Sequence, residues 1–250
     1  MMNYIIYGNT SYLDVLQIQT DYMVGRGHLT LFIDANTKDL GELYSRYDNI
    51  VFYNNNDQYA KRLLTCLSKI QDEYFLLIHD IDILINVDNS ILTKLRDLVV
   101  SNGFDRLDLK YSENKISSNS IEIDDLTLVK QDNPQDYIYN VNPSIWKKEA
   151  LVDLLSSFPY KTYRSIEEMD VQNFSMKYNV FKIHASNHLD CGYFKVLNFF
   201  KFLHISHGGK LLPLNNSFTT PYGQSYIDAS DEYAKIVYKY NLTESPKWIK

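Results

Sequence analysis

Short apolar runs alternate with amphipathic segments through the first third of the chain. Each run consists mainly of aliphatic and aromatic residues, which is typical of strands buried in a parallel sheet. The predicted strands are 3–7, 28–33, 50–53 and 74–78, with helices over 12–23 and 57–70 between them. In the second helix, apolar residues from Ala60 to Ile70 recur with a period of about 3.6 residues. This order of elements predicts the first half of an open, doubly wound α/β sheet.

The second half of the chain continues the alternation less regularly. The expected elements are strands over 106–111, 121–123, 126–129, 137–141 and 180–183, a surface loop over 112–120, and helices over 91–101, 145–155, 165–178 and 225–240. Ser144 is placed to cap the helix that begins at Ile145. Ser165 and Glu168 match the S-x-x-E capping box, so helix capping is a sufficient structural explanation for Glu168.

Composition narrows the partners and the compartment that we expect. A net charge of -6 argues against a nucleic-acid groove as the main surface, and neither a G-x-G-x-x-G nor a P-loop motif is present. The 2 cysteines lack metal-ligand spacing, and the amino terminus runs straight into a strand, so we expect a reducing, cytoplasmic setting. The apolar stretch 193–205 is too short to span a membrane; it packs in the core or, alternatively, lies on a membrane surface.

Two aspartates follow directly after the predicted strand 74–78. In an open α/β sheet, ligands bind outside the carboxyl ends of the strands, which is where Asp80 and Asp82 fall. Two neighbouring carboxylates repel each other unless a cation lies between them or one of them is protonated. A hard divalent cation, bound by one or two carboxylates and by substrate phosphates, fits this arrangement. We therefore predict a site for Mg²⁺ or Mn²⁺ and a diphosphate.

A second candidate for metal binding is the segment 204–210, which contains two histidines, two glycines and a lysine. Imidazole can ligate Mn²⁺, so His207 is a candidate third ligand. A solvated loop is the favoured explanation of the same residues.

Three sequence blocks occur in a characteristic order: His79-Asp80-Ile81-Asp82, then the segment 142–149 (NPSIWKKE), then 167–170 (EEMD). Together they resemble GT-A fold glycosyltransferases, in particular small transferases encoded by large DNA viruses and by bacterial surface-polysaccharide gene clusters. The resemblance implies a single Rossmann-like α/β domain over 1–210, with a mostly parallel central sheet flanked by helices. Its nucleotide-binding half would be 1–85 and its acceptor half 86–210, followed by a small helical extension over 211–250.

The resemblance also implies roles for individual residues. Asp80 and Asp82 would hold Mn²⁺ or Mg²⁺ against the diphosphate of a nucleotide sugar, often a UDP-sugar. The residues implied to seat the nucleoside are Tyr7, Gly8, Asn9, Asp34 and Arg62. Trp146 and Asp170 would lie on the acceptor side. The alternatives are a loop-capping role for Asp34, a surface position for Arg62 and a core position for Trp146.

Inverting members of that family carry an acidic pair at the start of a helix, with the second acid as the general base. Glu168 aligns with this base, and Glu167 is the second candidate. The expected activity is transfer of a sugar, with inversion, from a UDP-linked donor to a glycan or another hydroxyl acceptor, as in polysaccharide biosynthesis.

Two other functions use some of the same residues. The motif Asp80-Ile81-Asp82 also resembles the first motif of HAD-type phosphatases, with Lys110 and Asp124-Asp125 in the later motifs. That motif usually lies on the first strand, whereas three predicted strands precede it here. A non-catalytic module that binds sugar nucleotides or glycans is the remaining alternative.

Overall fold

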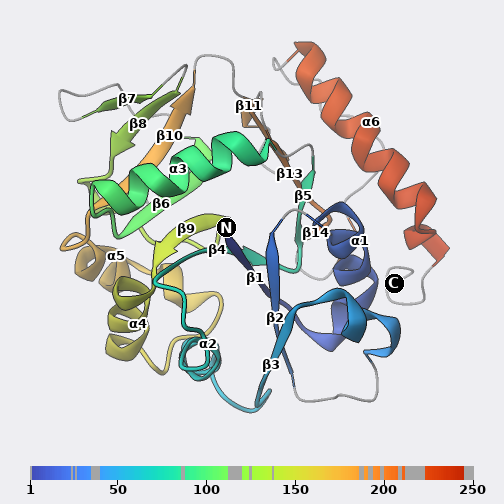
Figure 1. Ribbon diagram of the computed structural model, residues 1–250, viewed down its shortest axis with the longest axis horizontal. Coiled ribbons are helices and arrows are strands. Elements are labelled where there is room, and N and C mark those ends of the chain that lie inside the picture. The colour runs from blue at the N-terminus through green and yellow to red at the C-terminus, as the bar shows by residue number, and fades with distance from the viewer. Residues whose placement is uncertain are drawn as a thin grey trace.

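The computed structural model describes residues 2–23, 25, 27–34, 40–85, 88–111, 120–123, 126–136, 138–185, 189–190, 194–197, 200–207, 210–211 and 223–244. A nine-stranded sheet forms its centre (Figure 1). Its strands are β1 (Asn3–Tyr7), β2 (His28–Asp34), β3 (Asn49–Tyr53), β4 (Tyr74–His79), β6 (Arg106–Tyr111), β7 (Ile121–Ile123), β8 (Leu126–Lys130), β9 (Ser144–Lys147) and β10 (Val180–Ala185). Their order across the sheet is β3-β2-β1-β4-β9-β6-β10-β8-β7.

The amino-terminal half of the sheet is parallel. β1 pairs with β2 on one side and with β4 on the other, and β3 continues the sheet beyond β2. The direction in which new strands are added therefore reverses between β1 and β4. Such a switch point is where open α/β sheets leave a crevice for ligands, because the loops on its two sides diverge.

One antiparallel strand changes the pattern in the other half. β9 runs between β4 and β6 and is antiparallel to both, while β6 and β10 are parallel to each other. Because β9 is reversed, its first residue, Ser144, lies opposite Leu77 near the carboxyl end of β4. The segment that leads into β9 therefore lies at the same edge of the sheet as the switch point.

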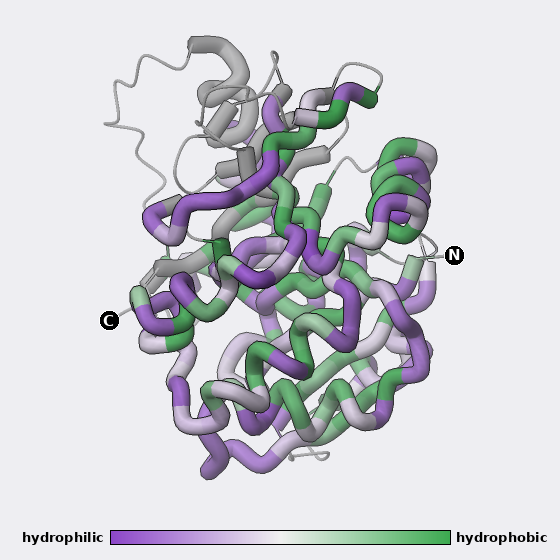
Figure 2. The backbone as a smooth tube through the Cα atoms, turned by 90° about the vertical axis from the view of Figure 1, so that its left-hand side faces the viewer, coloured by the Kyte–Doolittle hydropathy of each residue, from purple (hydrophilic) through white to green (hydrophobic). Residues whose placement is uncertain are grey.

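Helices cover both faces of the sheet. They are α1 (Leu13–Met23), α2 (Tyr59–Leu67), α3 (Asn89–Ser101), α4 (Lys148–Ser157) and α5 (Met169–Ser175). Along β1, Tyr4 and Ile6 pack in a core with α1 and α3, whereas Ile5 and Tyr7 pack in a core with α2 and α4. This alternation is the two-residue period of a strand buried on both faces. Figure 2 shows the matching pattern in the helices, where apolar and polar segments alternate.

A smaller sheet and the last helix form a third core. The sheet contains β5 (Asp82–Ile85), β13 (Phe200–His204), β12 (Phe194–Leu197) and β11 (Leu189–Asp190), paired in that order. Ile83 of β5, Leu203 of β13 and Val237 of α6 (Gly223–Lys239) are buried together with residues of α1. In the described part of the chain, no helix combines the length and the apolar character that crossing a membrane requires.

The structure confirms the predicted fold class, and most predicted elements appear within a few residues of their expected ends. The stretch 193–205, expected in the core, supplies β12 and β13 of the smaller sheet. The predicted surface loop 112–120 lies outside the described residues except for Ser120, and the turn at Asp124-Asp125 of the predicted hairpin lies outside them as well.

Four local predictions were wrong. Residues 138–141 form bends instead of a strand, and the strand in this region is β9. Ser144 is therefore a strand residue, and Lys147 precedes the first turn of α4. The predicted helix 165–178 is interrupted at Glu168, whose extended backbone (φ -70°, ψ 161°) separates a 3₁₀ turn at Ser165–Glu167 from α5. The Glu168 side chain makes no capping hydrogen bond there, so the capping box does not form.

Gly8, at the end of β1, packs against α1 so closely that a side chain would collide with it. A Cβ atom at this position would lie 2.8 Å from Cδ2 of Leu16, which is fully buried. We expect Gly8→Ala to lower the free energy of unfolding by about 1–3 kcal/mol, the usual cost of overpacking. Urea denaturation measures this change. Leu16→Val removes the colliding atoms, so Gly8→Ala should cost much less in that background. An equal cost in both backgrounds would contradict the steric explanation.

Candidate functional site

The D-x-D motif lies at the switch point of the large sheet. The backbone N–H of Asp80 donates to the carbonyl of Tyr7 at 2.9 Å, which continues the β1–β4 pairing by one residue. Its carboxylate accepts a hydrogen bond from the backbone N–H of Asn9 at 2.9 Å. Asp80 is only 9% exposed. The turn after β4 and the loop after β1 are thus held together by Asp80.

Asp82 marks the passage from the large sheet to the small one. It is the first residue of β5 and is 4% exposed. The buried side chain of Gln19, on α1, donates to its backbone carbonyl. Strand pairing places the backbone of His204 opposite Asp82, and the N–H of Ile205 donates to the carbonyl of Ile81 at 2.8 Å. The motif is therefore fixed by α1 and by both sheets.

The loop after β1 is held by the residues that were predicted to bind the nucleoside. Both carboxylate oxygens of Asp34 accept hydrogen bonds from Thr10, at 2.6 Å from its N–H and 2.7 Å from its hydroxyl. The carbonyl of Gly8 accepts a hydrogen bond from the Tyr53 hydroxyl at 2.7 Å. The Asn9 side chain accepts one from the N–H of Ser11. Asp34 thus caps this loop, which was the structural alternative for it.

Aromatic rings pack beside the switch point, on the α2 side of the sheet. Tyr7 stacks on Tyr53 with 5.3 Å between ring centroids and meets Tyr59 edge-on at the same distance. The Tyr59 hydroxyl lies 2.8 Å from Nε2 of His79, the residue that precedes Asp80. The guanidinium of Arg62 lies 5.4 Å from the centroid of Tyr53. Burial raises the pKa of Tyr7 to about 12, against the opposing charge of Arg62.

Tyr163 connects this aromatic cluster with the acidic residues. Its ring packs edge-on against His79 and Tyr59, at 5.5 Å from each centroid. Although the residue as a whole is 38% exposed, loss of water around the hydroxyl raises its pKa, and the nearby negative charges of Asp82, Asp80 and Glu167 raise it further. The D-x-D motif and Glu167 therefore act on the same side chain, which was not singled out from the sequence. One signal for it was its position two residues before the acidic helix start.

The two consecutive glutamates have different surroundings, because the backbone is extended at Glu168. Glu167 is half-buried, and its Oε1 accepts a hydrogen bond from the backbone N–H of Val141 at 2.8 Å. The Glu168 side chain is 61% exposed and accepts a hydrogen bond from Nζ of Lys161 at 2.6 Å. Lys161 also lies 2.9 Å from Asp170, and hydrogen bonds to these two acids raise the pKa of its ammonium group.

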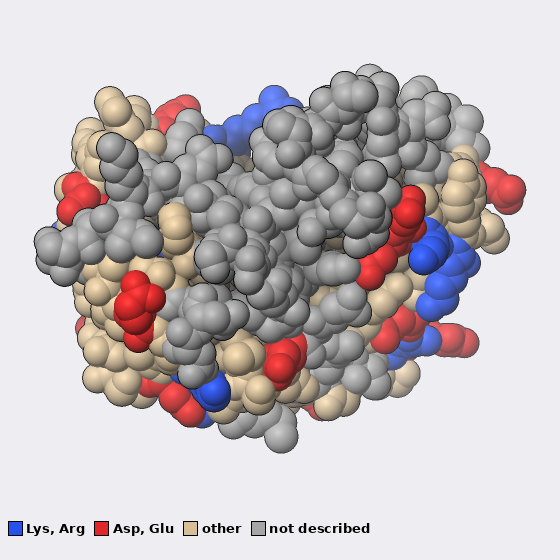
Figure 3. Space-filling view, turned by 90° about the horizontal axis from the view of Figure 1, so that it is seen from above, with Lys and Arg blue, Asp and Glu red and all other residues tan. Residues whose placement is uncertain are grey.

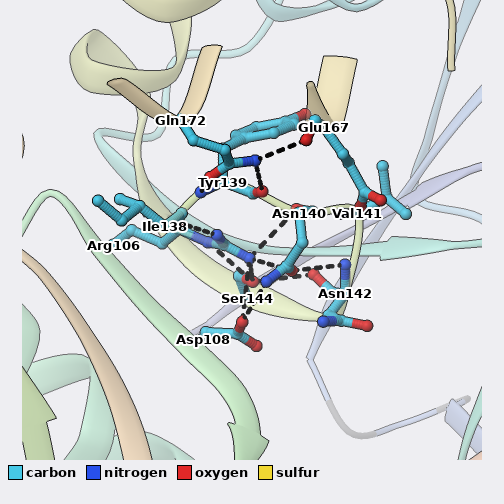
Figure 4. Close-up of polar contacts among 10 residues, drawn as sticks. All are labelled: Arg106, Asp108, Ile138, Tyr139, Asn140, Val141, Asn142, Ser144, Glu167 and Gln172. Carbon is cyan, nitrogen blue, oxygen red and sulfur yellow. Dashed lines mark hydrogen bonds and ion pairs between the residues drawn. The ribbon is translucent and has the colours of Figure 1, made fainter. Parts of the chain in front are cut away.

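A buried polar network lies behind Glu167 (Figure 4). The guanidinium of Arg106, which is fully buried in β6, donates to the carbonyls of Ile138 and Asn140 and to the side chains of Asn140 and Ser144. It also lies 3.4 Å from the carboxylate of Asp108. The sequence offered a signal for this pair, since residues two apart in a strand share a face and these two carry opposite charges.

Trp146 belongs to the core instead of an acceptor surface. It is 2% exposed in β9 and packs in the core with α2 and α4. Its ring lies 4.9 Å from the guanidinium of Arg106. Burial leaves it no open ring face for a sugar, so the core alternative describes its position.

His207 lies in β14 (Ser206–His207), opposite Lys210 of β15 (Lys210–Leu211), and it is His204 whose backbone pairs with Asp82.

Asp80 and Asp82 are the described side chains best suited to hold a cation. Both are buried carboxylates, and oxygen ligands suit Mg²⁺ and Mn²⁺. Within the described ranges, no group of three or more His, Cys, Asp and Glu side chains could hold a metal ion. On the face drawn in Figure 3, at its right-hand side, Lys and Arg side chains lie next to Asp and Glu side chains.

No protein-family model matches the sequence, and no curated protein matches it. Solved structures do. The crystal structure of S. aureus TarS 1-349 in complex with UDP-GlcNAc matches with a TM-score of 0.52 and 12% identity, covering 100% of this chain and 79% of that chain. A cytidylyltransferase from Leptospira borgpetersenii matches with a TM-score of 0.49 and 13% identity over 94% of both chains. In another TarS 1-349 structure the match covers only 60% of that chain. At such identities the likeness shows the fold, and this chain has the GT-A-like fold that the sequence resemblance implied.

Proposed function

We propose that this protein is a metal-dependent glycosyltransferase that moves a sugar from a nucleotide-sugar donor to a hydroxyl acceptor. The observation that carries the proposal is the position of Asp80, which ties the turn after β4 to the loop after β1 at the switch point of the sheet. Support comes from the GT-A-like fold shared with TarS, whose structure was solved with UDP-GlcNAc. A UDP-linked sugar is therefore the donor to test first.

Asp80 and Asp82 are the residues proposed to hold the divalent cation together with the donor diphosphate. When bound, such a cation offsets the negative charge that accumulates on a departing diphosphate. The Arg62 guanidinium, beside Tyr53 and the loop after β1, is proposed to lie near the nucleotide. Its hydrogen bonds to the carbonyls of Asp57 and Asn55 already orient it, so that little side-chain entropy would be lost on binding.

Glu167 is the better candidate for the general base. Its carboxylate is half-buried and oriented by the N–H of Val141, and its charge acts on Tyr163 together with those of Asp80 and Asp82. The charge of Glu168 is already matched by Lys161, and its side chain is mostly exposed. This ordering reverses the sequence-based preference for Glu168. Asp170 shares Lys161 with Glu168, so both acids are proposed to shape the acceptor side of the site.

In the proposed reaction, the acceptor hydroxyl oxygen forms a bond to the anomeric carbon of the donor sugar. The bond from that carbon to the diphosphate oxygen breaks, and the diphosphate leaves with the electron pair. The hydroxyl proton passes to the carboxylate of Glu167. Attack from the side opposite the leaving group inverts the configuration at the anomeric carbon.

The phosphatase alternative receives less support from the fold. The strand that carries the motif, β4, is the fourth strand of the chain and lies inside the sheet, whereas the phosphatase motif usually lies on the first strand. Hydrolysis of a generic aryl phosphate that is lost in Asp80→Asn would nevertheless favour it. Ligand binding without any turnover would favour the binding module.

Metal and nucleotide should stabilise the protein only when both are present. Two carboxylates alone are an incomplete coordination shell, and a diphosphate would meet their repulsion without a cation. UDP at about 100 times its dissociation constant should add about 2.7 kcal/mol of stability in the presence of Mn²⁺. A thermal-shift titration of UDP, Mn²⁺ and both together measures this effect. The nearly isosteric variant Asp82→Asn should abolish it. The same stabilisation in the presence of EDTA would contradict a metal-bridged site.

The two glutamates provide a matched pair of substitutions for the base. Glu167→Gln should lower kcat for UDP release from UDP-GlcNAc by about 10²–10⁴-fold, the usual contribution of a general base, with little change in donor affinity. Glu168→Gln, the same chemical change one residue away, should lower kcat by less than about tenfold. Steady-state kinetics at saturating donor and Mn²⁺ compare the two variants. The opposite ranking would assign the base to Glu168, and equal rates in both variants would refute this inverting mechanism.

A further inference from the structure

The segment 138–143 crosses the sheet edge beside the D-x-D motif. It adopts no regular helix or strand and leads into β9, whose first residue pairs with Leu77 of β4 and with Asp108 of β6. The N–H of Leu109, near the end of β6, donates to the carbonyl of Pro143 at 3.1 Å. Irregular backbone that is largely buried must find its hydrogen-bond partners outside the helix and sheet ladders.

Arg106 supplies partners for two backbone carbonyls and one side chain of this segment. Its hydrogen bonds reach the carbonyls of Ile138 (2.5 Å) and Asn140 (3.2 Å) and the side-chain oxygen of Asn140 (2.6 Å). The amide of Asn140 in turn donates to Asp108 at 2.7 Å, and its oxygen also accepts from the N–H of Asn142. One fully buried cation thus holds both the backbone and a side chain of this segment (Figure 4).

A buried ion pair is a poor device for stability alone. Desolvation of two charges opposes their attraction, and well-packed apolar residues often stabilise a core equally well. Arg106 is also enclosed by the rings of Trp146 and Tyr139, at 4.9 and 5.7 Å from its guanidinium carbon. Such an arrangement favours one geometry of the segment over its alternatives, because any other geometry leaves buried polar groups without partners.

Hydrogen bonds connect this segment to Glu167. The N–H of Val141, the residue after Asn140, donates to Oε1 of Glu167 at 2.8 Å. Beside it, Gln172 of α5 exchanges two hydrogen bonds with the backbone of Tyr139 and donates to the carbonyl of Glu167 at 3.1 Å. The positions of both the carboxylate and the backbone of Glu167 therefore depend on hydrogen bonds that involve residues 139–141.

We propose that Arg106, Asp108 and Asn140 are positioning residues that hold the segment 138–143 as a rigid wall of the site and, through Val141, orient the Glu167 carboxylate. This inference rests on the proposed function, in which Glu167 accepts the acceptor proton. It goes further by assigning a role in turnover to a buried ion pair that touches neither metal nor substrate.

Asn140→Ala tests the role, and the chain offers a matched control in Asn3→Ala. Asn3 is 3% exposed and Asn140 is 7% exposed, and the amide of each donates to a carboxylate, at 2.8 Å to Asp72 and 2.7 Å to Asp108. Asn3 lies at the opposite, amino-terminal edge of the sheet, where β1 begins. Each variant loses an amide–carboxylate hydrogen bond of a buried asparagine, part-buried for Asn3 and fully buried for Asn140, so kcat is compared per folded molecule. Per folded molecule, Asn140→Ala should lower kcat for UDP release at least tenfold with KM for UDP-GlcNAc unchanged, and Asn3→Ala should leave both unchanged.

A double-mutant cycle separates positioning from stability. If Asn140 acts through Glu167, the variant that combines Asn140→Ala with Glu167→Gln should be no slower than Glu167→Gln alone. Multiplied rate losses, or equal kcat values for Asn140→Ala and Asn3→Ala, would overturn the inference.

Amide hydrogen exchange gives a second readout that needs no turnover. Asn140→Ala should speed exchange in a peptide that covers 138–144, and Asn3→Ala should leave that peptide unchanged. Unchanged exchange in Asn140→Ala would overturn the inference even if UDP release by that variant were slower. Failure of the parent protein to release UDP from any nucleotide sugar, with the exchange result as expected, would instead count against the proposed function.

Discussion

The hydrogen bonds of Asp80 are the contacts on which the geometry of the site depends. Its N–H extends the pairing of β4 with β1, and its carboxylate holds the N–H of Asn9. A buried carboxylate keeps its charge only where hydrogen-bond donors or cations compensate for lost water. The backbone N–H of Asn9 is one such donor. Asp82, two residues after Asp80, begins β5, which belongs to the smaller sheet. The acidic motif is therefore built into the fold.

The acceptor side of the site depends on a break in the backbone. An uninterrupted helix from Ser165 would have made Glu168 a capping residue. Instead, the backbone is extended at Glu168. The Glu167 carboxylate then bonds to the backbone N–H of Val141, and the Glu168 carboxylate bonds to Lys161. Lys161 is itself anchored, because its carbonyl accepts a hydrogen bond from the N–H of Ala60 at the start of α2. Helix α2, which also carries Arg62, thus supports both the nucleotide side and the acidic turn.

The reversed strand β9 connects these two sides. Because it runs antiparallel between β4 and β6, the chain before it must cross the carboxyl edge of the sheet, where Val141 contacts Glu167. The backbone groups of this crossing segment lie outside the sheet ladder and need other hydrogen-bond partners. The guanidinium of Arg106 satisfies several of them at once, since its five N–H donors lie in a fixed plane. The same feature that interrupts the parallel sheet thus creates the need for a buried cation.

The sequence by itself determined the strands that are buried on both faces and the acidic motif that follows one of them. Those features are local: a continuous apolar run requires a covered strand, and Asp80 lies one residue past its end. Tertiary structure decided what depends on partners distant in sequence. Ser144 is a strand residue because its backbone pairs with β4 and β6. Trp146 lies in the same strand and is a core residue for the same reason. The different surroundings of Glu167 and Glu168 are set by Val141 and Lys161, and no local period in the sequence records contacts of that kind.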